Sequence, residues 1–231
     1  MQKKKIITIG PVSAQSEDIE FIASSLSFLS TDYTIDYLDS LSIMEELPNK
    51  AYYKLWEQKL AACIEEYDAF FGFAFGGVII QQCFPLFTKV YKPIILFSTP
   101  TFANNQLTKQ LNQVISLCRE NKLQEALKTL YHFVFYPNQM PLSSSKLRHK
   151  TQACKRLIFG LTRVLSTDST EILKKNKVNH THLIGEYSNL VNTGNVIKAK
   201  NGRLIVVPKA SMRILQDNLL FCQKIILEAL K

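Results

Sequence analysis

The stretch from Tyr67 to Ile80 limits the fold of this chain more than any other part of its sequence. It starts as a run of apolar side chains, is interrupted at Gly72, Gly76 and Gly77, and then continues as a second apolar run. A buried strand that turns abruptly into a helix packed on the same sheet has this pattern. We therefore expect an α/β protein with this strand near the centre of its sheet.

Further strand and helix patterns alternate on both sides of this stretch. Short apolar or alternating runs predict strands at residues 4–9, 33–38, 92–98, 182–185 and 203–207. Apolar residues at helical spacing predict helices at residues 16–29, 52–67, 77–84 and 212–230. Such alternation favours a mostly parallel central sheet with helices on both faces.

Residues 101–165 interrupt this alternation. They contain no strand pattern, and their apolar spacing predicts three helices, at residues 107–120, 123–135 and 147–165. We interpret residues 1–231 as a single domain in which residues 101–165 form a helical insertion. The insertion holds ten Lys or Arg against two Asp or Glu, and so supplies most of the net charge of +9.

The positive charge of the insertion has two interpretations. It can serve solubility alone, or it can attract an acidic partner such as a carrier protein. Candidate residues for such contacts are Arg148, Lys150, Lys155 and Arg156. No nucleic-acid recognition motif accompanies them, so nucleic acid is an improbable partner.

Other classes of site find little support in the sequence. The five cysteines are dispersed and lie mostly in apolar segments, which indicates reduced thiols and a cytoplasmic location. No run approaches the ~20 apolar residues of a membrane span. His180 and His182 form the only close histidine pair, and a histidine at the start of this strand is expected at the surface, so we expect no metal. Phosphate-loop and dinucleotide motifs are absent as well, which predicts no cofactor.

The order of the elements resembles that of the α/β-hydrolases over nearly the whole chain. Gly72-x-Ala74-x-Gly76 resembles their nucleophile elbow G-x-S-x-G, which carries the catalytic serine. In this family a helical lid follows the strand after the elbow, and residues 101–165 occupy that place. Small bacterial acyl esterases and thioesterases share this size and layout. The resemblance implies an α/β-hydrolase fold with a helical lid.

The resemblance also implies that the catalytic triad is degenerate. The nucleophile position falls on Ala74, the acid position on Ser188 within Gly185–Val191, and the histidine position on Ser211. A methyl group cannot attack a carbonyl, and a serine hydroxyl is no base near pH 7. An alternative alignment would use Glu186 as the acid and His180 or His182 as the base. His132 and His149 fall in the predicted lid helices, where solvated or packing roles are expected.

The family's oxyanion site departs from its pattern in part. Its first donor would come from Pro11, after Ile9-Gly10, but proline has no N–H to donate. A shift of one residue would make Val12 the donor, and Phe75 N–H would be the second donor. By the same resemblance, Gly10, Phe73 and Phe75 would form walls of a ligand pocket.

Two functions follow from the resemblance. The first is a catalytically inactive hydrolase-like protein that binds a small acyl or apolar ligand, or a protein partner. The second is a serine hydrolase of acyl esters or thioesters, including carrier-protein or CoA esters, in which alanine has replaced the nucleophile at position 74.

Overall fold

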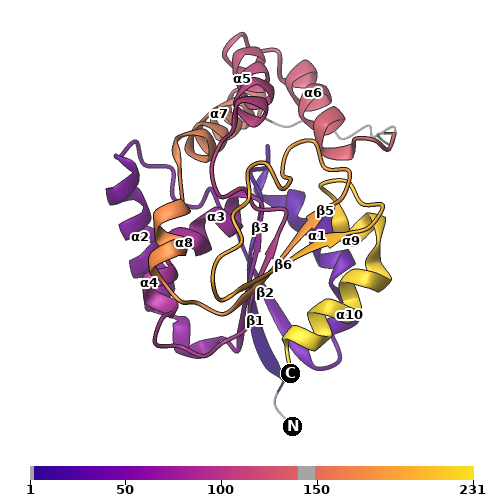
Figure 1. Cartoon of the computed structure of the whole chain (residues 1–231). Helices are drawn as coiled ribbons and strands as arrows, with labels where there is room; N and C mark the ends of the chain where they lie inside the picture. The colour runs from indigo at the N-terminus through magenta and orange to yellow at the C-terminus, as the bar shows by residue number, and fades with distance from the viewer. Residues whose placement is uncertain (1–2, 140–148) are drawn as a thin grey trace.

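The protein is built around one sheet of six parallel strands in the order β2-β1-β3-β4-β5-β6 (Figure 1). The computed structural model describes residues 3–139 and 149–231. The strands are β1 (Lys4–Ile9), β2 (Tyr33–Leu38), β3 (Ala69–Phe73), β4 (Ile94–Phe97), β5 (His180–Gly185) and β6 (Gly202–Val207). The predicted parallel sheet is therefore confirmed, and each predicted strand is present within a few residues.

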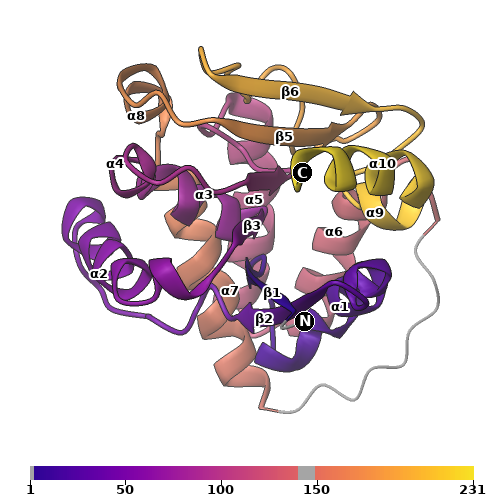
Figure 2. The same ribbon diagram turned by 90° about the horizontal axis from the view of Figure 1, so that it is seen from below.

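Helices cover both faces of the sheet, as Figure 2 shows from below. The first face carries α2 (Asn49–Ala61), α3 (Phe75–Gln82), α4 (Phe84–Phe87) and α8 (Thr170–Lys175). The second face carries α1 (Glu20–Ser25), α9 (Ile214–Asp217) and α10 (Leu219–Ala229). The sheet thus separates two apolar cores.

The strand β3 links these two cores because its side chains alternate between them. Phe70 packs edge-on against Phe87 on the first face, with ring centroids 4.9 Å apart. Phe71 packs against Phe97 on the second face, at 5.5 Å. Burial on both faces explains why β3 is apolar without alternation in the sequence.

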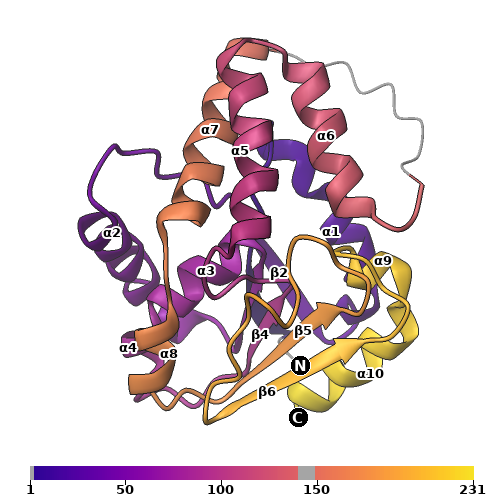
Figure 3. The same ribbon diagram turned by 45° about the horizontal axis from the view of Figure 1, so that its top comes forward.

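Three helices lie together beyond the carboxyl ends of the strands (Figures 1 and 3). We refer to α5 (Asn105–Arg119), α6 (Leu123–Phe135) and α7 (Lys150–Ser166) as the cap helices. The α5 helix begins where the Asn104 side chain accepts a hydrogen bond from Leu107 N–H (2.9 Å). The α6 bounds match the prediction. None of the helices in the described part of the chain combines the length and apolar character that a membrane span requires.

Three predicted helices are interrupted in the structure. The helix predicted at 16–29 is α1 flanked by 3-10 turns at Ser16–Ile19 and Ser27–Leu29. The helix predicted at 52–67 is α2 followed by a 3-10 turn at Ile64–Glu66. The helix predicted at 212–230 is divided into α9 and α10 by Asn218, whose backbone is not helical (φ −145°, ψ 66°) and whose side chain accepts Phe221 N–H.

The two histidines of β5 are buried, which corrects the expectation of a surface residue at the start of this strand. His180 Nδ1 lies 2.9 Å from the Val178 carbonyl oxygen, and its ring packs against Phe84. His182 Nε2 accepts the Thr99 N–H at 3.3 Å. Burial, together with the neighbouring His180, lowers the pKa of His182 to about 3.

This buried imidazole predicts acid sensitivity. In the unfolded chain His182 has an ordinary pKa of about 6.5, so the unfolded state binds the extra proton first as pH falls. Stability is then full above about pH 6.5 and decreases towards pH 3. Replacing His182 by Gln, whose carbonyl oxygen can accept the Thr99 N–H, should flatten the pH dependence of the unfolding free energy by a few kcal/mol over this range.

Urea unfolding at several pH values measures this effect, with His132→Gln as the matched control because His132 is exposed on α6. If His182→Gln and His132→Gln show the same slope as the unmodified protein between pH 7 and pH 4, His182 does not carry the acid sensitivity.

Candidate functional site

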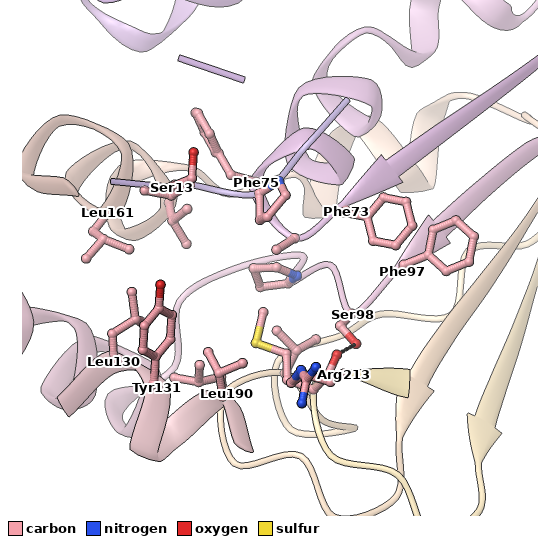
Figure 4. Close-up of a pocket in the computed structure, with 18 of the residues that line it drawn as sticks. Ser13, Phe73, Phe75, Phe97, Ser98, Leu130, Tyr131, Leu161, Leu190 and Arg213 are labelled. Carbon is pink, nitrogen blue, oxygen red and sulfur yellow. Dashed lines mark hydrogen bonds between the residues drawn. The ribbon is translucent and has the colours of Figure 1, made fainter. Parts of the chain in front are cut away.

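A cavity of about 170 Å³ lies between the carboxyl ends of the strands and the cap helices. Figure 4 shows part of its lining. It opens where the strand order reverses between β1 and β3, the place at which ligands bind in open parallel sheets. Its apolar wall includes Leu107, Leu111, Leu127, Leu130, Leu157, Leu161 and Leu190. Its polar lining consists of Ser13, Asp18, Ser98, Tyr131, Arg213 and Gln216.

Ala74 occupies a strained turn between β3 and α3 and lines this cavity. Its backbone has φ 47° and ψ −108°, a region that non-glycine residues rarely adopt. Ala74 N–H donates to the Phe97 carbonyl oxygen (2.9 Å), and its own carbonyl oxygen accepts Val78 N–H (3.1 Å). This turn has the geometry of an elbow that presents a side chain to a pocket, and the side chain presented is a methyl group.

The elbow needs glycine at positions 76 and 77 because a larger residue would not fit there, and not because the backbone has a positive φ. A Cβ atom on Gly76 would overlap the Ile9 carbonyl oxygen at the end of β1. A Cβ atom on Gly77 would overlap the hydroxyl of Thr99, just after β4. Since both glycines have ordinary negative φ, their role is the close approach of α3 to the neighbouring strands.

The residues predicted to form the oxyanion site, Phe75, Pro11 and Val12, all line the cavity. Phe75 N–H lies in the first turn of α3, where amides have no intrahelical acceptor. The Pro11 carbonyl oxygen accepts the Ser40 hydroxyl (3.0 Å), which fixes the loop after β1. Phe73, predicted as a pocket wall, also lines the cavity, whereas Gly10 is buried outside the lining against Ile19.

Ser188 and Ser211, the predicted acid and base positions, are buried and do not line the cavity. Ser188 Oγ accepts Val191 N–H (3.2 Å), and Ser211 Oγ accepts Arg213 N–H (3.0 Å). Both hydroxyls therefore stabilise local turns. The positions that the resemblance assigned to the acid and the base therefore do not share the cavity with Ala74.

The alternative alignment does not assemble a triad either. Glu186 is exposed and its carboxylate accepts Lys209 N–H (2.7 Å). His180 and His182 make the buried contacts described above, and His132 and His149 are exposed. None of the four histidines of the chain lines the cavity.

Arg213, in the segment after β6 that lines the cavity, is a charged lining residue that the sequence analysis missed. It is half-buried, and its guanidinium carbon lies 4.0 Å from the centre of the Phe135 ring at the end of α6. Burial lowers the pKa of Arg213, and the nearby Asp217 opposes this shift. In the sequence, Arg213 stands between the apolar residues Met212 and Ile214, and this placement could have indicated that its side chain is partly buried.

Ser98 and Asp18 complete the polar lining. Ser98, at the end of β4, has φ 44°, and its hydroxyl donates to the Met212 carbonyl oxygen (2.8 Å), which fixes the loop that carries Arg213. Asp18 accepts Gln15 N–H (3.0 Å). Burial raises the pKa of Asp18, and also that of Tyr131.

Arg156 of α7 is a structural residue, which corrects its assignment to a partner surface. Only 9% of it is exposed. Its Nη2 lies 3.0 Å from both carboxylate oxygens of Asp39, after β2, and its Nε donates to the Ser13 carbonyl oxygen (3.2 Å). This Arg156 bridge holds a cap helix to the two loops that follow β1 and β2. The acidic-partner prediction now depends on Lys150 and Lys155, which are exposed, because Arg148 lies outside the described residues.

Comparisons with known proteins agree with this architecture. No family model matches the sequence, and no curated protein matches it either. Solved structures do match along almost the whole chain. An α/β-hydrolase enzyme from a deep-sea metagenome library of the Medee basin is 10% identical with a TM-score of 0.76, over 99% of this chain and 90% of its own.

Two further structures have similar scores. MenH from S. aureus is 15% identical with a TM-score of 0.68, over 100% of this chain and 94% of its own. An esterase from Exiguobacterium antarcticum is 12% identical with a TM-score of 0.71, over 99% of this chain and 92% of its own. The protein therefore has the α/β-hydrolase fold. Identities this low establish the fold alone.

The Arg156 bridge predicts a specific loss of stability. Replacing Arg156 by Met leaves the Asp39 carboxylate without its partner in a mostly buried place, which should cost about 2 to 3 kcal/mol of unfolding free energy. Arg156→Lys should cost less, because it keeps the charge but cannot contact Asp39 and Ser13 together.

Chemical denaturation provides the measurement. Lys155→Met is the matched control: it removes an exposed charge from the adjacent position and should change stability by less than about 0.5 kcal/mol. Equal losses for Arg156→Met and Lys155→Met would show that the bridge contributes nothing to stability.

Proposed function

We propose that this protein binds a small acyl or other apolar ligand in the cavity above Ala74 and does not hydrolyse it. One observation carries the proposal: the elbow presents a methyl group to a cavity that no histidine lines. Serine hydrolases need a nucleophile and a base within hydrogen-bond reach of each other. The elbow position itself carries no hydroxyl, and no histidine lines the cavity beside it.

Binding is supported by the character of the cavity wall. Leucine and valine side chains from all three cap helices line it, together with Phe73 and Phe75 from the elbow. Small-molecule sites are mostly apolar hollows with a few polar groups that orient the ligand. The strained backbone at Ala74 is also in place, so the elbow retains its shape without its nucleophile.

The alternative is a hydrolase of acyl esters or thioesters whose serine at position 74 was replaced by alanine. Its support is the likeness to hydrolase and esterase structures. A serine at this place would still need a base. Arg213 is the basic side chain of the cavity lining, and a guanidinium stays protonated and cannot accept a proton from serine.

A serine introduced at the elbow separates the two proposals. Ala74→Ser should show no hydrolysis of p-nitrophenyl butyrate or octanoate above the rate of the unmodified protein, because no histidine lines the cavity to act as the base. The measurement is nitrophenolate release at pH 7 to 8, with mass spectrometry to detect a covalent acyl-enzyme.

The control is Ala74→Ser combined with Ser98→Ala, since Ser98 is the other hydroxyl near the elbow. Saturable turnover by the unmodified protein would refute the non-hydrolysing proposal. Turnover that arises only in Ala74→Ser, and persists without Ser98, would favour the ester hydrolase.

A further inference from the structure

We infer that the ligand of this cavity is a carboxylate with a short apolar chain, held by Arg213 and by Phe75 N–H. The inference rests on the proposed function and makes its ligand class specific. Three features of the cavity carry it: a cation without an acidic partner, free amide donors at the elbow, and an apolar wall of limited volume.

Arg213 is a half-buried cation that lacks a carboxylate of its own. Among the described residues, no Asp or Glu oxygen lies within 4.0 Å of its guanidinium. The nearby Asp217 carboxylate is occupied by Ser211 N–H (2.7 Å). The Phe135 ring covers one side of the guanidinium, and Asp217, which makes no ion pair with it, compensates its charge only in part. A partly desolvated cation on an apolar wall favours an anionic ligand.

The first turn of α3 supplies donors for the same anion. Phe75, which lines the cavity, has an N–H without an acceptor within its helix, and the N-terminal end of a helix attracts negative charge. In an active hydrolase such donors stabilise an oxyanion that exists only during the reaction. With Ala74 at the elbow no such oxyanion arises, and a permanent carboxylate suits the donors instead.

Asp18 limits the orientation that a carboxylate ligand can take in the cavity. It lines the cavity and interacts electrostatically with Tyr131, and Figure 4 shows Tyr131 on a different part of the wall from Arg213. A carboxylate is repelled by Asp18 and attracted by Arg213. The apolar chain therefore extends from Arg213 towards the leucines of the cap helices.

The volume of the cavity limits the chain. At about 170 Å³ it is comparable to the engineered protein cavities of roughly 150 Å³ that hold benzene. A chain of about six to eight carbons suits this space. Octanoate is thus a suitable probe, with 1-octanol as its uncharged analogue and acetate as its head group alone.

Isothermal titration of the full chain with these three probes tests the inference. Octanoate should bind at least about tenfold more tightly than 1-octanol, and acetate should bind weakly. Arg213→Gln should weaken octanoate binding about tenfold or more and leave 1-octanol binding unchanged. Arg213→Lys should weaken it less. Arg203→Gln is the matched control, because Arg203 is exposed on β6 and pairs with Glu228 outside the cavity.

The outcomes separate this inference from the proposed function. Equal binding of octanoate and 1-octanol, both unaffected by Arg213→Gln, overturns the carboxylate inference and leaves the apolar-ligand proposal in place. Binding of neither probe counts against both. If Arg213→Gln does not fold by circular dichroism, octanoate binding by the unmodified protein must weaken as NaCl is raised, and a salt-independent affinity overturns the inference.

Discussion

The close approach of α3 to the ends of β1 and β4 is the constraint on which the rest of the site depends. Gly76 and Gly77 leave no room for a Cβ atom against Ile9 and Thr99, so the helix can start only at this distance from the sheet. The chain must therefore turn sharply at Ala74, which accepts a strained backbone. That turn fixes the place of Phe75 N–H and of the cavity above it.

Some of the positive charges of the cap helices make buried structural contacts, which the composition of the segment does not reveal. Arg156 joins α7 to Asp39 and Ser13, and Arg163 of the same helix donates to Asn49 (2.7 Å) and to the Glu45 carbonyl oxygen (2.9 Å). Two basic residues of the insertion are thus buried connections between α7 and the segments that follow β1 and β2. The net positive charge of the segment overstates the charge available to a partner.

The elbow of this protein has the shape found in hydrolases, whereas its lack of hydrolysis is our proposal. The strained elbow and the loop after β1 are present. Arg213 lines the cavity, two residues after Ser211, where the resemblance places a histidine. A site of this kind is suited to hold an anion, because a guanidinium stays charged and does not accept protons.

The sequence by itself determined the strands, the parallel sheet, the elbow and the helical insertion, because apolar periodicity and glycine placement are local properties of the chain. It also placed Phe73, Ala74 and Phe75 at one site, since they are adjacent in sequence. Only the tertiary structure decided that Ser188 and Ser211 turn away from the cavity, that Arg213 enters it, and that Arg156 and His182 are buried. Each of these depends on how a loop or helix packs against distant segments, and burial of a polar side chain is set by partners that sequence spacing does not specify.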